Sequence, residues 1–467
     1  MPYIFYALLV LIFSGCAHSL QDSEISSTYN LPASFRNNGS IEFLNDNKSN
    51  HAYKDPLQEM KNMLNDKEFI YILDQANEIN PDLLILLSKV KQAKYQVKSS
   101  TGALIPKISG GLDYSYNDKT DGLNGSLNFS WEIDIYGKLD ALRRSKKELV
   151  KYAEENYING KVILFSDTAS YYFSLRKSYA QLTFAMQMLE NYKEILNIYS
   201  AMRKAGLIDE SKYIETTMDF LNAQNNVQKY QIEVEQNKNA LYMLINNKDI
   251  NISNNLIYNT DFIPNLPKIN NIASEVILNR PDVRTAIYTL NSELYNRYSK
   301  KTALLPNLSL SGNIGKLFAS SSGPADFVYQ IIASLTAPLF NRQELYAQLK
   351  IQEETVFQAE QSLQKAINKA ISEIENSTYA SSSSTITFNN TKNILENAKI
   401  SMDILKSRWE NGLIDDILYL QSQNDYLNTF ISFYNAWYEN ISSSIMLYKS
   451  FGGSFSISGK HEVKNNG

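Results

Sequence analysis

The sequence of 467 residues has few of the side chains that enzymes use. It contains one cysteine, Cys16, and three histidines, His18, His51 and His461, all in terminal segments. No Ser/His/Asp or Cys/His set and no histidine-rich metal site can be assembled in the body of the chain. Carboxylate-only catalysis stays formally open, but no paired-acid motif stands out. We expect neither an enzyme nor a cofactor.

Proline, glycine and surplus positive charge are also scarce. Eleven prolines and 18 glycines favour long uninterrupted elements over many short ones. The formal net charge of -4 argues against a nucleic-acid partner, because binding phosphates requires a basic surplus. Apolar residues make up 43% of the chain, which is enough for a core.

The N-terminus carries an apolar run from Tyr3 to Phe13, followed by Ser14-Gly15-Cys16-Ala17. The run is shorter than the roughly 20 residues of a spanning helix and fits the apolar region of a secretory signal. A cysteine directly after small residues resembles a bacterial lipobox, whose thiol is lipidated. Phe13 stands where leucine is usual there, and no Lys or Arg precedes the run. We expect a signal peptide over 1–15 and lipidation of Cys16; a cysteine of an ordinary cleaved signal is the alternative.

The segments beside the body of the chain are polar. Residues 16–66 are rich in Ser, Asn and Asp and show little periodicity, which predicts a lipid-anchored, extended N-terminal segment. Residues 456–467 predict a disordered tail.

The strongest signal is an internal repeat. Two motifs recur 200 residues later, and a third recurs 206 residues later, all in the same order. They are Asn80-Pro81-Asp82 with Arg280-Pro281-Asp282, Ala103 to Ser109 with Ala303 to Ser309, and Gly206-Leu207-Ile208-Asp209 with Gly412-Leu413-Ile414-Asp415. Such recurrence indicates a tandem duplication. We assign copy one to residues 67–270 and copy two to residues 271–455.

Each copy predicts a helix followed by two strands. The helix runs from the Pro-Asp pair to the residue before the next proline, because proline suits a first helical turn and disfavours helix before it. The apolar period then changes from 3.6 to 2, in runs of about 10 residues separated in copy one by Asp121-Gly122. Strands that are apolar on one face and small and polar on the other are typical of a membrane β-barrel; a soluble sandwich hairpin is the alternative. The apolar series in copy one is Ile108, Leu112, Tyr114, Tyr116, then Leu123, Leu127, Phe129, Trp131 and Ile133.

A long helix and a returning helix follow the strands. The long helix is expected over residues 138–204 of copy one, where it would measure roughly 100 Å and end before Gly206. Its apolar residues keep the three-four spacing of a coiled-coil seam. They are Val162, Phe165, Ala169, Tyr172, Leu175, Tyr179, Leu182, Met186 and Leu189. The returning helix has apolar residues seven apart, from Tyr213 to Leu241 in copy one and from Leu413 to Tyr448 in copy two.

These lengths constrain the assembly. The helix before the strands, of about 24 residues, and the returning helix, of about 35, together match the long helix. Four strands per chain do not close a barrel, and lipid does not tolerate open sheet edges. Three chains in a ring would supply about 12 strands and 12 helical columns. The fold class is therefore mainly α with a membrane β-barrel: a trimeric 12-strand β-barrel on a long α-helical coiled-coil tunnel.

Three segments carry a resemblance to a known family. They are Trp131 to Lys138 (WEIDIYGK), Arg280 to Arg284 (RPDVR) and Pro338 to Arg342 (PLFNR), the last without the glycine that is usual there. From Asp66 to Gly453 the chain resembles the TolC-like outer membrane efflux proteins, and in particular their lipid-anchored branch that is partnered with RND pumps. The resemblance implies a homotrimer in the outer membrane that extends into the periplasm. Its partners would be a periplasmic adaptor protein, an inner-membrane RND-type transporter and outer-membrane lipid.

The same resemblance places the functional residues at the two helix-to-helix turns. The adaptor contact is expected at the tips, for which helix termination alone is the alternative reading of each glycine. The expected tip residues are Ala205, Gly206, Leu207, Ile208, Asn411, Gly412, Leu413 and Ile414. The channel constriction is expected just beyond the second tip, at Asp415, Asp416, Ile417 and Gln421. Gln421 stands where relatives have an aspartate, and the two aspartates also suit a helical first turn.

The function implied is a passive conduit for drugs and other small molecules, opened by adaptor docking. The outer-membrane channel of a type I protein secretion system is the first alternative. A periplasmic adaptor fits less well, because adaptors have one hairpin flanked by β-rich domains. A structural coiled-coil lipoprotein without a pore is the last alternative. The sequence indicates neither the exported substrates nor the particular pump.

Overall fold

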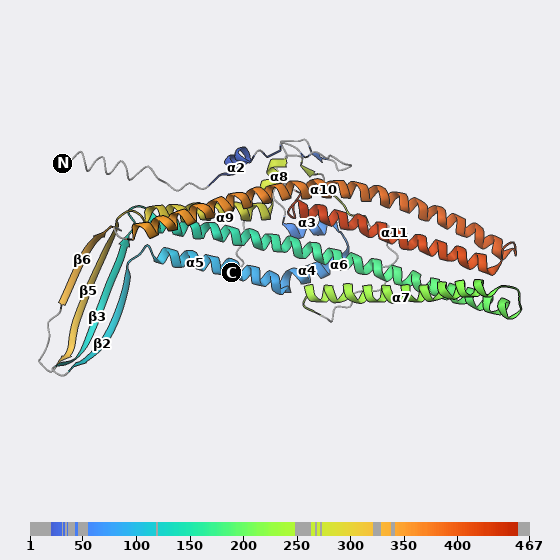
Figure 1. Cartoon of the computed structure of the whole chain (residues 1–467), viewed down its shortest axis with the longest axis horizontal. Coiled ribbons are helices and arrows are strands. Elements are labelled where there is room, and N and C mark those ends of the chain that lie inside the picture. Colours follow the sequence, from blue (N-terminus) through green and yellow to red (C-terminus); the bar gives the residue numbers. More distant parts are fainter. Residues whose placement is uncertain are drawn as a thin grey trace. The chain divides into compact units, whose positions relative to one another are not determined.

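The computed structural model describes residues 20–29, 31–32, 35, 43–44, 55–117, 120–247, 263–266, 269–270, 273–320, 328–337 and 341–455 (Figure 1). The expected signal peptide, Cys16, the tail over 456–467 and Pro338 to Phe340 lie outside these residues.

The duplication is visible in the element lengths. Helices α5 (Pro81–Gly102) and α9 (Pro281–Thr302) have 22 residues each, and the returning helices α7 (Glu210–Leu244) and α11 (Asp416–Ser450) have 35 each. The long helices α6 (Lys138–Lys204) and α10 (Arg342–Glu410) have 67 and 69 residues. Equivalent residues are thus 200 apart before the strands, 204 apart at the start of the long helices and 206 apart at their ends, so the offset drifts in the strands and the long helices.

The described part of the chain forms two compact units that do not coincide with the two copies. Unit 1 contains residues 1–31, 85–157 and 281–368, and unit 2 contains residues 32–84, 158–280 and 369–467. Each unit therefore combines segments from both copies. This arrangement agrees with the rule that a single repeat does not bury its apolar faces alone.

Unit 1 is built around a four-stranded antiparallel sheet in the order β2-β3-β5-β6. Its strands are β2 (Lys107–Asn117), β3 (Thr120–Ile133), β5 (Asn307–Ser320) and β6 (Val328–Thr336). Asp121 and Gly122 do not form the first hairpin turn, because they already pair with Tyr116 and Ser115. The antiparallel pairing continues as far as Asn117 and Thr120, so the strands extend past Asp121-Gly122.

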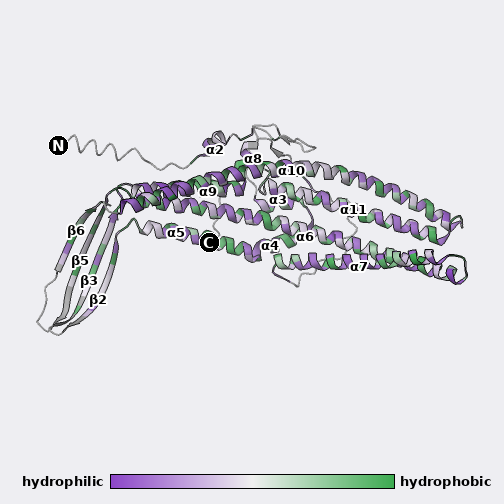
Figure 2. Ribbon diagram, viewed as in Figure 1, coloured by the Kyte–Doolittle hydropathy of each residue, from purple (hydrophilic) through white to green (hydrophobic). Residues whose placement is uncertain are grey.

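The alternation expected for the strands is present, and the apolar face of the sheet is exposed in the single chain. The register places Ile108 opposite Phe129, Leu127 opposite Ile314, and Gly312 opposite Ile331, all on one face. Ile108, Tyr329 and Ile331 are 74–80% exposed. In Figure 2 the strands alternate between hydrophobic and hydrophilic residues.

The helical part of unit 1 includes a short N-terminal helix, α2 (Asp22–Thr28). The backbone N–H of Leu20 donates to the Asn291 side chain at 3.0 Å, and Ile25 is fully buried. Unit 2 contains α3 (Pro56–Met63), α4 (Lys67–Ile79), α8 (Ala273–Asn279) and the parallel pair β1 (Phe43–Leu44) with β4 (Ile269–Asn270). The expectation of an extended segment over 16–66 is therefore wrong for α2 and α3, because buried apolar side chains and backbone capping compensate for the polar composition.

An aromatic cluster forms the core of unit 2. Phe69, Tyr172, Phe173 and Trp437 are buried and contact one another with ring centroids 5.0–5.8 Å apart. Arg176 lies among them and forms an ion pair of 2.9 Å with Asp66, the N-cap of α4. The cluster joins α4, α6 and α11, so residues far apart in the sequence share one core.

The predicted coiled-coil seam of α6 matches the buried residues over its first half. Towards the tip, the buried residues shift to other positions. Val162 to Leu175 of the predicted series are buried, but Met186 is 54% exposed, and Ala185 and Met188 are buried instead. A straight α-helix has 3.6 residues per turn, so a strict seven-residue pattern drifts around its surface.

In each copy one side chain joins the end of the returning helix to the start of the helix before the strands. The Asn80 amide donates to the carbonyl of Leu244 at 2.9 Å, and its oxygen accepts the N–H of Leu83 at 3.0 Å. Asn80 therefore caps α7 at its C-terminus and α5 at its N-terminus. We call such a residue a splice residue. The last turn of α7 and the first turn of α5, both in unit 2, are thus joined through one side chain.

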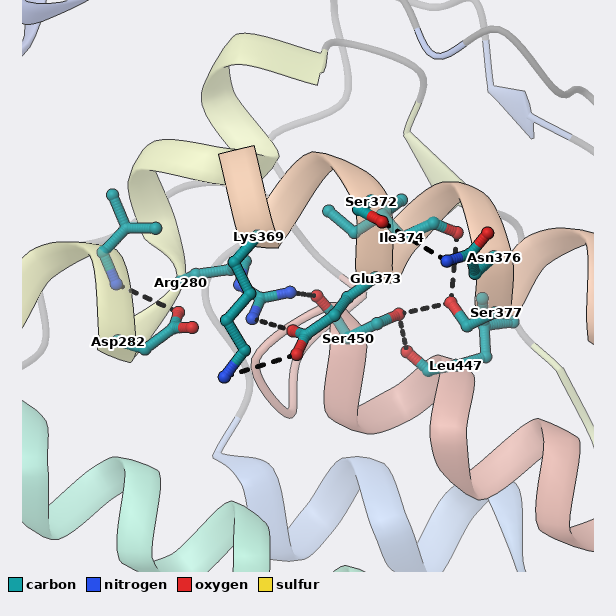
Figure 3. A network of polar contacts seen from close by, with 11 residues as sticks. Arg280, Asp282, Lys369, Ser372, Glu373, Ile374, Asn376, Ser377, Leu447 and Ser450 are labelled. Atoms are coloured by element: carbon teal, nitrogen blue, oxygen red, sulfur yellow. Dashed lines mark hydrogen bonds and ion pairs between the residues drawn. The ribbon is translucent and has the colours of Figure 1, made fainter. Parts of the chain in front are cut away.

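Arg280 is the splice residue of copy two (Figure 3). Its Nη1 donates to the carbonyl of Ser450 at 2.5 Å, which is the repeat equivalent of the contact between Asn80 and Leu244. Its Nη2 lies 2.6 Å from Glu373 of α10, and Lys369 lies 3.5 Å from the same carboxylate. Arg280 thus adds an ion pair that the asparagine of copy one does not form through its side chain.

Candidate functional site: the two hairpin tips

The predicted site residues lie in two turns of unit 2. Tip one, residues 203–213, joins α6 to α7, and tip two, residues 409–419, joins α10 to α11. Both turns lie at the same end of this unit, at the right of Figure 1. We treat them together because they are equivalent in the repeat.

Both turns use the same backbone geometry. Gly206 and Gly412 have φ values of +72° and +69°, a left-handed conformation that favours glycine. The N–H of Leu207 donates to the carbonyl of Met202 at 2.9 Å, and Leu413 donates to Arg408 at 2.9 Å. These are the bonds of a Schellman motif, so the glycines do end the long helices.

The next helix begins in the same way at both tips. The carboxylate of Asp209 accepts the N–H of Lys212 at 2.8 Å, and that of Asp415 accepts the N–H of Leu418 at 2.7 Å. Both aspartates are N-caps. The Gly-Leu-Ile-Asp motif that revealed the repeat is thus a helix stop followed by a helix start.

The tips expose an apolar side chain at equivalent positions. Leu207 is 71% exposed and Leu413 is 72% exposed, whereas Ile208 and Ile414 are half-buried. Ala205 and Asn411 are exposed as well, and the Asn411 amide donates to the carbonyl of Ser407. Both tips lie wholly within the described residues. In each of them, the leucine is the only large apolar side chain that is more than 70% exposed.

The expected constriction residues lie on the first turns of α11. Asp415, Asp416 and Gln421 are exposed, and Ile417 is half-buried. The Asp416 carboxylate accepts the indole N–H of Trp409 at 2.7 Å. Both aspartates therefore have structural partners inside the turn. Ile417 and Gln421 are four residues apart and share one face of α11.

Sequence reasoning missed three contact residues of tip one, Arg203, Glu210 and Tyr213, and two of tip two, Trp409 and Tyr419. In tip one, Arg203 contacts both Glu210 and Tyr213. In tip two, Trp409 contacts both Tyr419 and Asp416, and Asp416 was expected only as a constriction residue. Every member is 206 residues from its equivalent. An acid (Glu210, Asp416) and a tyrosine (Tyr213, Tyr419) recur at the offset of 206. A comparison of the two copies that accepts similar as well as identical residues would have pointed to both sets.

Across the residues that the structure describes, no group of three or more His, Cys, Asp or Glu side chains is placed to hold a metal ion. Within the same residues, none of the helices combines the length and the apolar character needed to cross a membrane.

Comparison with known proteins assigns this architecture to a family. Residues 72–247 and 272–453 match the outer membrane efflux protein family. The chain therefore belongs to this family, whose members are channel proteins of the outer membrane that work with efflux pump systems.

Individual relatives are distant but cover most of the chain. The solvent efflux pump outer membrane protein SrpC of Pseudomonas putida is 24% identical over 422 residues, which are 86% of this chain and 88% of that protein. The cation efflux system protein CusC of Escherichia coli O157:H7 is 23% identical over 405 residues, 83% of this chain and 86% of that protein. The crystal structure of the Campylobacter jejuni CmeC outer membrane channel covers 89% of this chain and 95% of its own, with a TM-score of 0.70 and 23% identity.

Proposed function

We propose that this chain is the outer-membrane channel component of a tripartite efflux system, a passive conduit that makes and breaks no covalent bond. The observation that carries the proposal is that one chain contains both two equivalent hairpin tips and a sheet whose exposed face is apolar. The family supplies the outer-membrane location, and the sheet supplies a surface suited to lipid. The names of the relatives, which include solvent and cation efflux proteins, favour small substrates over secreted proteins.

The sheet also supports a homotrimer. Within the described strands, β2 and β6 each have one neighbour and leave one edge open. Open edges are not tolerated in lipid, so β2 of one chain would pair with β6 of the next. Three chains would close a barrel of about 12 strands above a helical tunnel. A signal peptide over 1–15 and lipidation at Cys16 complete the proposed outer-membrane form.

The tips are the proposed adaptor contact. Ala205 to Ile208 and Asn411 to Ile414 form two turns of one geometry, and each turn exposes a leucine, Leu207 or Leu413. An adaptor from the periplasm and an RND-type transporter of the inner membrane are the proposed partners. Docking would splay the tip helices and open the constriction formed by Asp415, Asp416, Ile417 and Gln421 of three chains.

Deletion of the gene tests the function. The deletion strain should become more susceptible to drugs, solvents or metal cations, with an unchanged set of secreted proteins. Purified trimers should conduct ions in planar bilayers. Loss of secreted proteins with unchanged susceptibility would favour type I secretion, and a soluble monomer that conducts no ions would contradict the channel.

The tip acids require variants that separate charge from turn structure. Asp415→Asn and Asp416→Asn remove the charge but keep an oxygen that accepts the N–H of Leu418 or Trp409, and asparagine caps a helix about as well as aspartate. If carboxylate charge narrows the channel, the asparagine variants should raise single-channel conductance as much as Asp415→Ala and Asp416→Ala do. A rise in the alanine variants alone would assign the effect to a loosened turn, and no rise in any variant would remove both acids from the gate.

A further inference from the structure

Each tip contains three side chains that connect the last turn of the incoming helix to the first two turns of the outgoing one. In tip one, the guanidinium of Arg203 lies 3.9 Å from the centroid of the Tyr213 ring and donates to Glu210 at 2.9 Å. Its side chain therefore contacts one aromatic face and one carboxylate, and both partners belong to α7.

The equivalent set in tip two has the same geometry and a different chemistry. The indole of Trp409 stacks on the Tyr419 ring at 4.4 Å between centroids and 6° between planes. Its N–H donates to Asp416 at 2.7 Å. Tyrosine and the acid are retained between the copies, and the cationic arginine is replaced by a neutral aromatic ring.

We propose that these two sets are clasps that fix the tip turns, clasp one (Arg203, Glu210, Tyr213) by charge and clasp two (Trp409, Asp416, Tyr419) by stacking. An arginine on a tyrosine face with an exposed carboxylate is held by electrostatic attraction, which salt screens. Stacked aromatic rings are held mainly by dispersion and apolar burial, which salt does not screen. The two tips thus differ in stiffness under changing ionic strength, although their backbones are alike.

The clasps act on the exposed leucines, and through them on the proposed docking, so this part of the inference rests on the proposed function. Leu207 and Leu413 lie between the residues that each clasp joins. A leucine on a fixed turn loses less conformational entropy when a partner binds it. Arg203 and Trp409 are therefore positioning residues rather than contact residues.

Spin labels on Leu207→Cys and Leu413→Cys in the purified full-length trimer test the clasps directly. Trp409→Ala should cause loss of the immobilised spectral component at position 413 and leave position 207 unchanged, and Arg203→Ala should do the reverse. In the unsubstituted clasps, 1 M salt should mobilise the label at 207 and not the label at 413. Equal responses of both labels to salt, or no response to the alanine variants, would overturn the proposal.

Two milder substitutions at Trp409 separate a change of the clasp from a general folding defect. Trp409→Arg places the arginine of copy one next to the tyrosine and the acid of copy two. The label at position 413 should then keep its immobilised component at low salt and lose it at 1 M salt. Trp409→Phe keeps the stacking and removes the N–H donor, so it should remain insensitive to salt. A Trp409→Arg variant that is mobile at every salt concentration, or immobile at every one, contradicts the charge-against-stacking distinction.

Efflux is read in the same variants through the drug susceptibility of the complemented deletion strain. If the variants change the mobility of the labels but the gene has no effect on drug susceptibility, the proposed function is contradicted and the clasps are still supported. Wild-type mobility in Trp409→Ala would overturn the clasps whatever the susceptibility.

Discussion

At the scale of single residues, the helical part of unit 1 contains a buried carboxyl group in an unusual state. Glu155 of α6 is 4% exposed, and burial raises its pKa from 4.5 to about 8, with Arg284 lowering it and Glu154 raising it. Removing a carboxylate from water disfavours its charged form, and Arg284 offsets this only in part. Glu155 is therefore protonated in the folded protein at neutral pH.

This protonation makes stability depend on pH. Below about pH 4.5 Glu155 is protonated in both the folded and the unfolded chain and has no pH-dependent effect. Between 4.5 and 8 the folded chain retains the proton that the unfolded chain releases, so stability falls as pH rises, by at most roughly 1.4 kcal/mol per pH unit. Glu155→Gln should remove this slope and raise the temperature of trimer dissociation at pH 8 more than at pH 5. The neighbouring Glu154→Gln removes a charge that raises the pKa of Glu155, so it should keep the slope and move its upper end to lower pH. The same slope in wild type and Glu155→Gln would contradict the assignment.

At the scale of elements, the splice residues explain why the Pro-Asp motif recurs. The proline begins α5 and α9, and the residue before it caps the helix that arrives from the tip. Asn80 serves both helix ends, whereas Arg280 has no acceptor and instead bonds to Glu373. The motif thus marks a joint between two helices as well as a helix start.

Replacing Asn80 tests this joint. Asn80→Ala should lose one N-cap, worth about 1 kcal/mol, and one hydrogen bond to Leu244, worth about 0.5–1.5 kcal/mol. Hydrogen exchange should become faster both in the first turn of α5 and in the last turn of α7. Asn80→Asp keeps the acceptor for Leu83 and loses the donor, so faster exchange should be confined to the end of α7. Faster exchange at both ends in Asn80→Asp would contradict the double role.

The sequence predicts elements better than the contacts between them. The bounds of α6 and the order of the elements in each copy follow from periodicity and from the positions of proline and glycine, which act locally. The ion pair of Arg176 and Asp66 joins residues 110 positions apart that only folding brings together, and no local pattern marks it. Asp121-Gly122 separates the two apolar runs in the sequence and is a favoured turn pair, yet the strand register pairs these residues with Tyr116 and Ser115, because pairing between strands overrides local turn preference.

At the scale of the whole molecule, the sheet has one face for lipid and one for the channel lumen in the proposed trimer. The apolar face includes Ile331, and the polar face includes the preceding residue, Gln330. Both side chains are exposed in the single chain and lie near the middle of β6. As neighbours on one strand, the two residues would lie at nearly the same depth in the membrane, and their side chains point to opposite faces of the sheet.

A lysine at each position distinguishes the two faces. A lysine facing lipid at the bilayer midplane costs about 2–4 kcal/mol, and in a trimer this cost is incurred once per chain. Ile331→Lys should therefore reduce the amount of heat-modifiable trimer in outer-membrane fractions strongly. Gln330→Lys should leave the trimer intact and shift ion selectivity towards anions in planar bilayers, because its charge would face the lumen. If the two variants assemble equally well, or if Gln330→Lys is the one that fails to assemble, the apolar face does not contact lipid, and a soluble sandwich becomes the better explanation of the alternating strands.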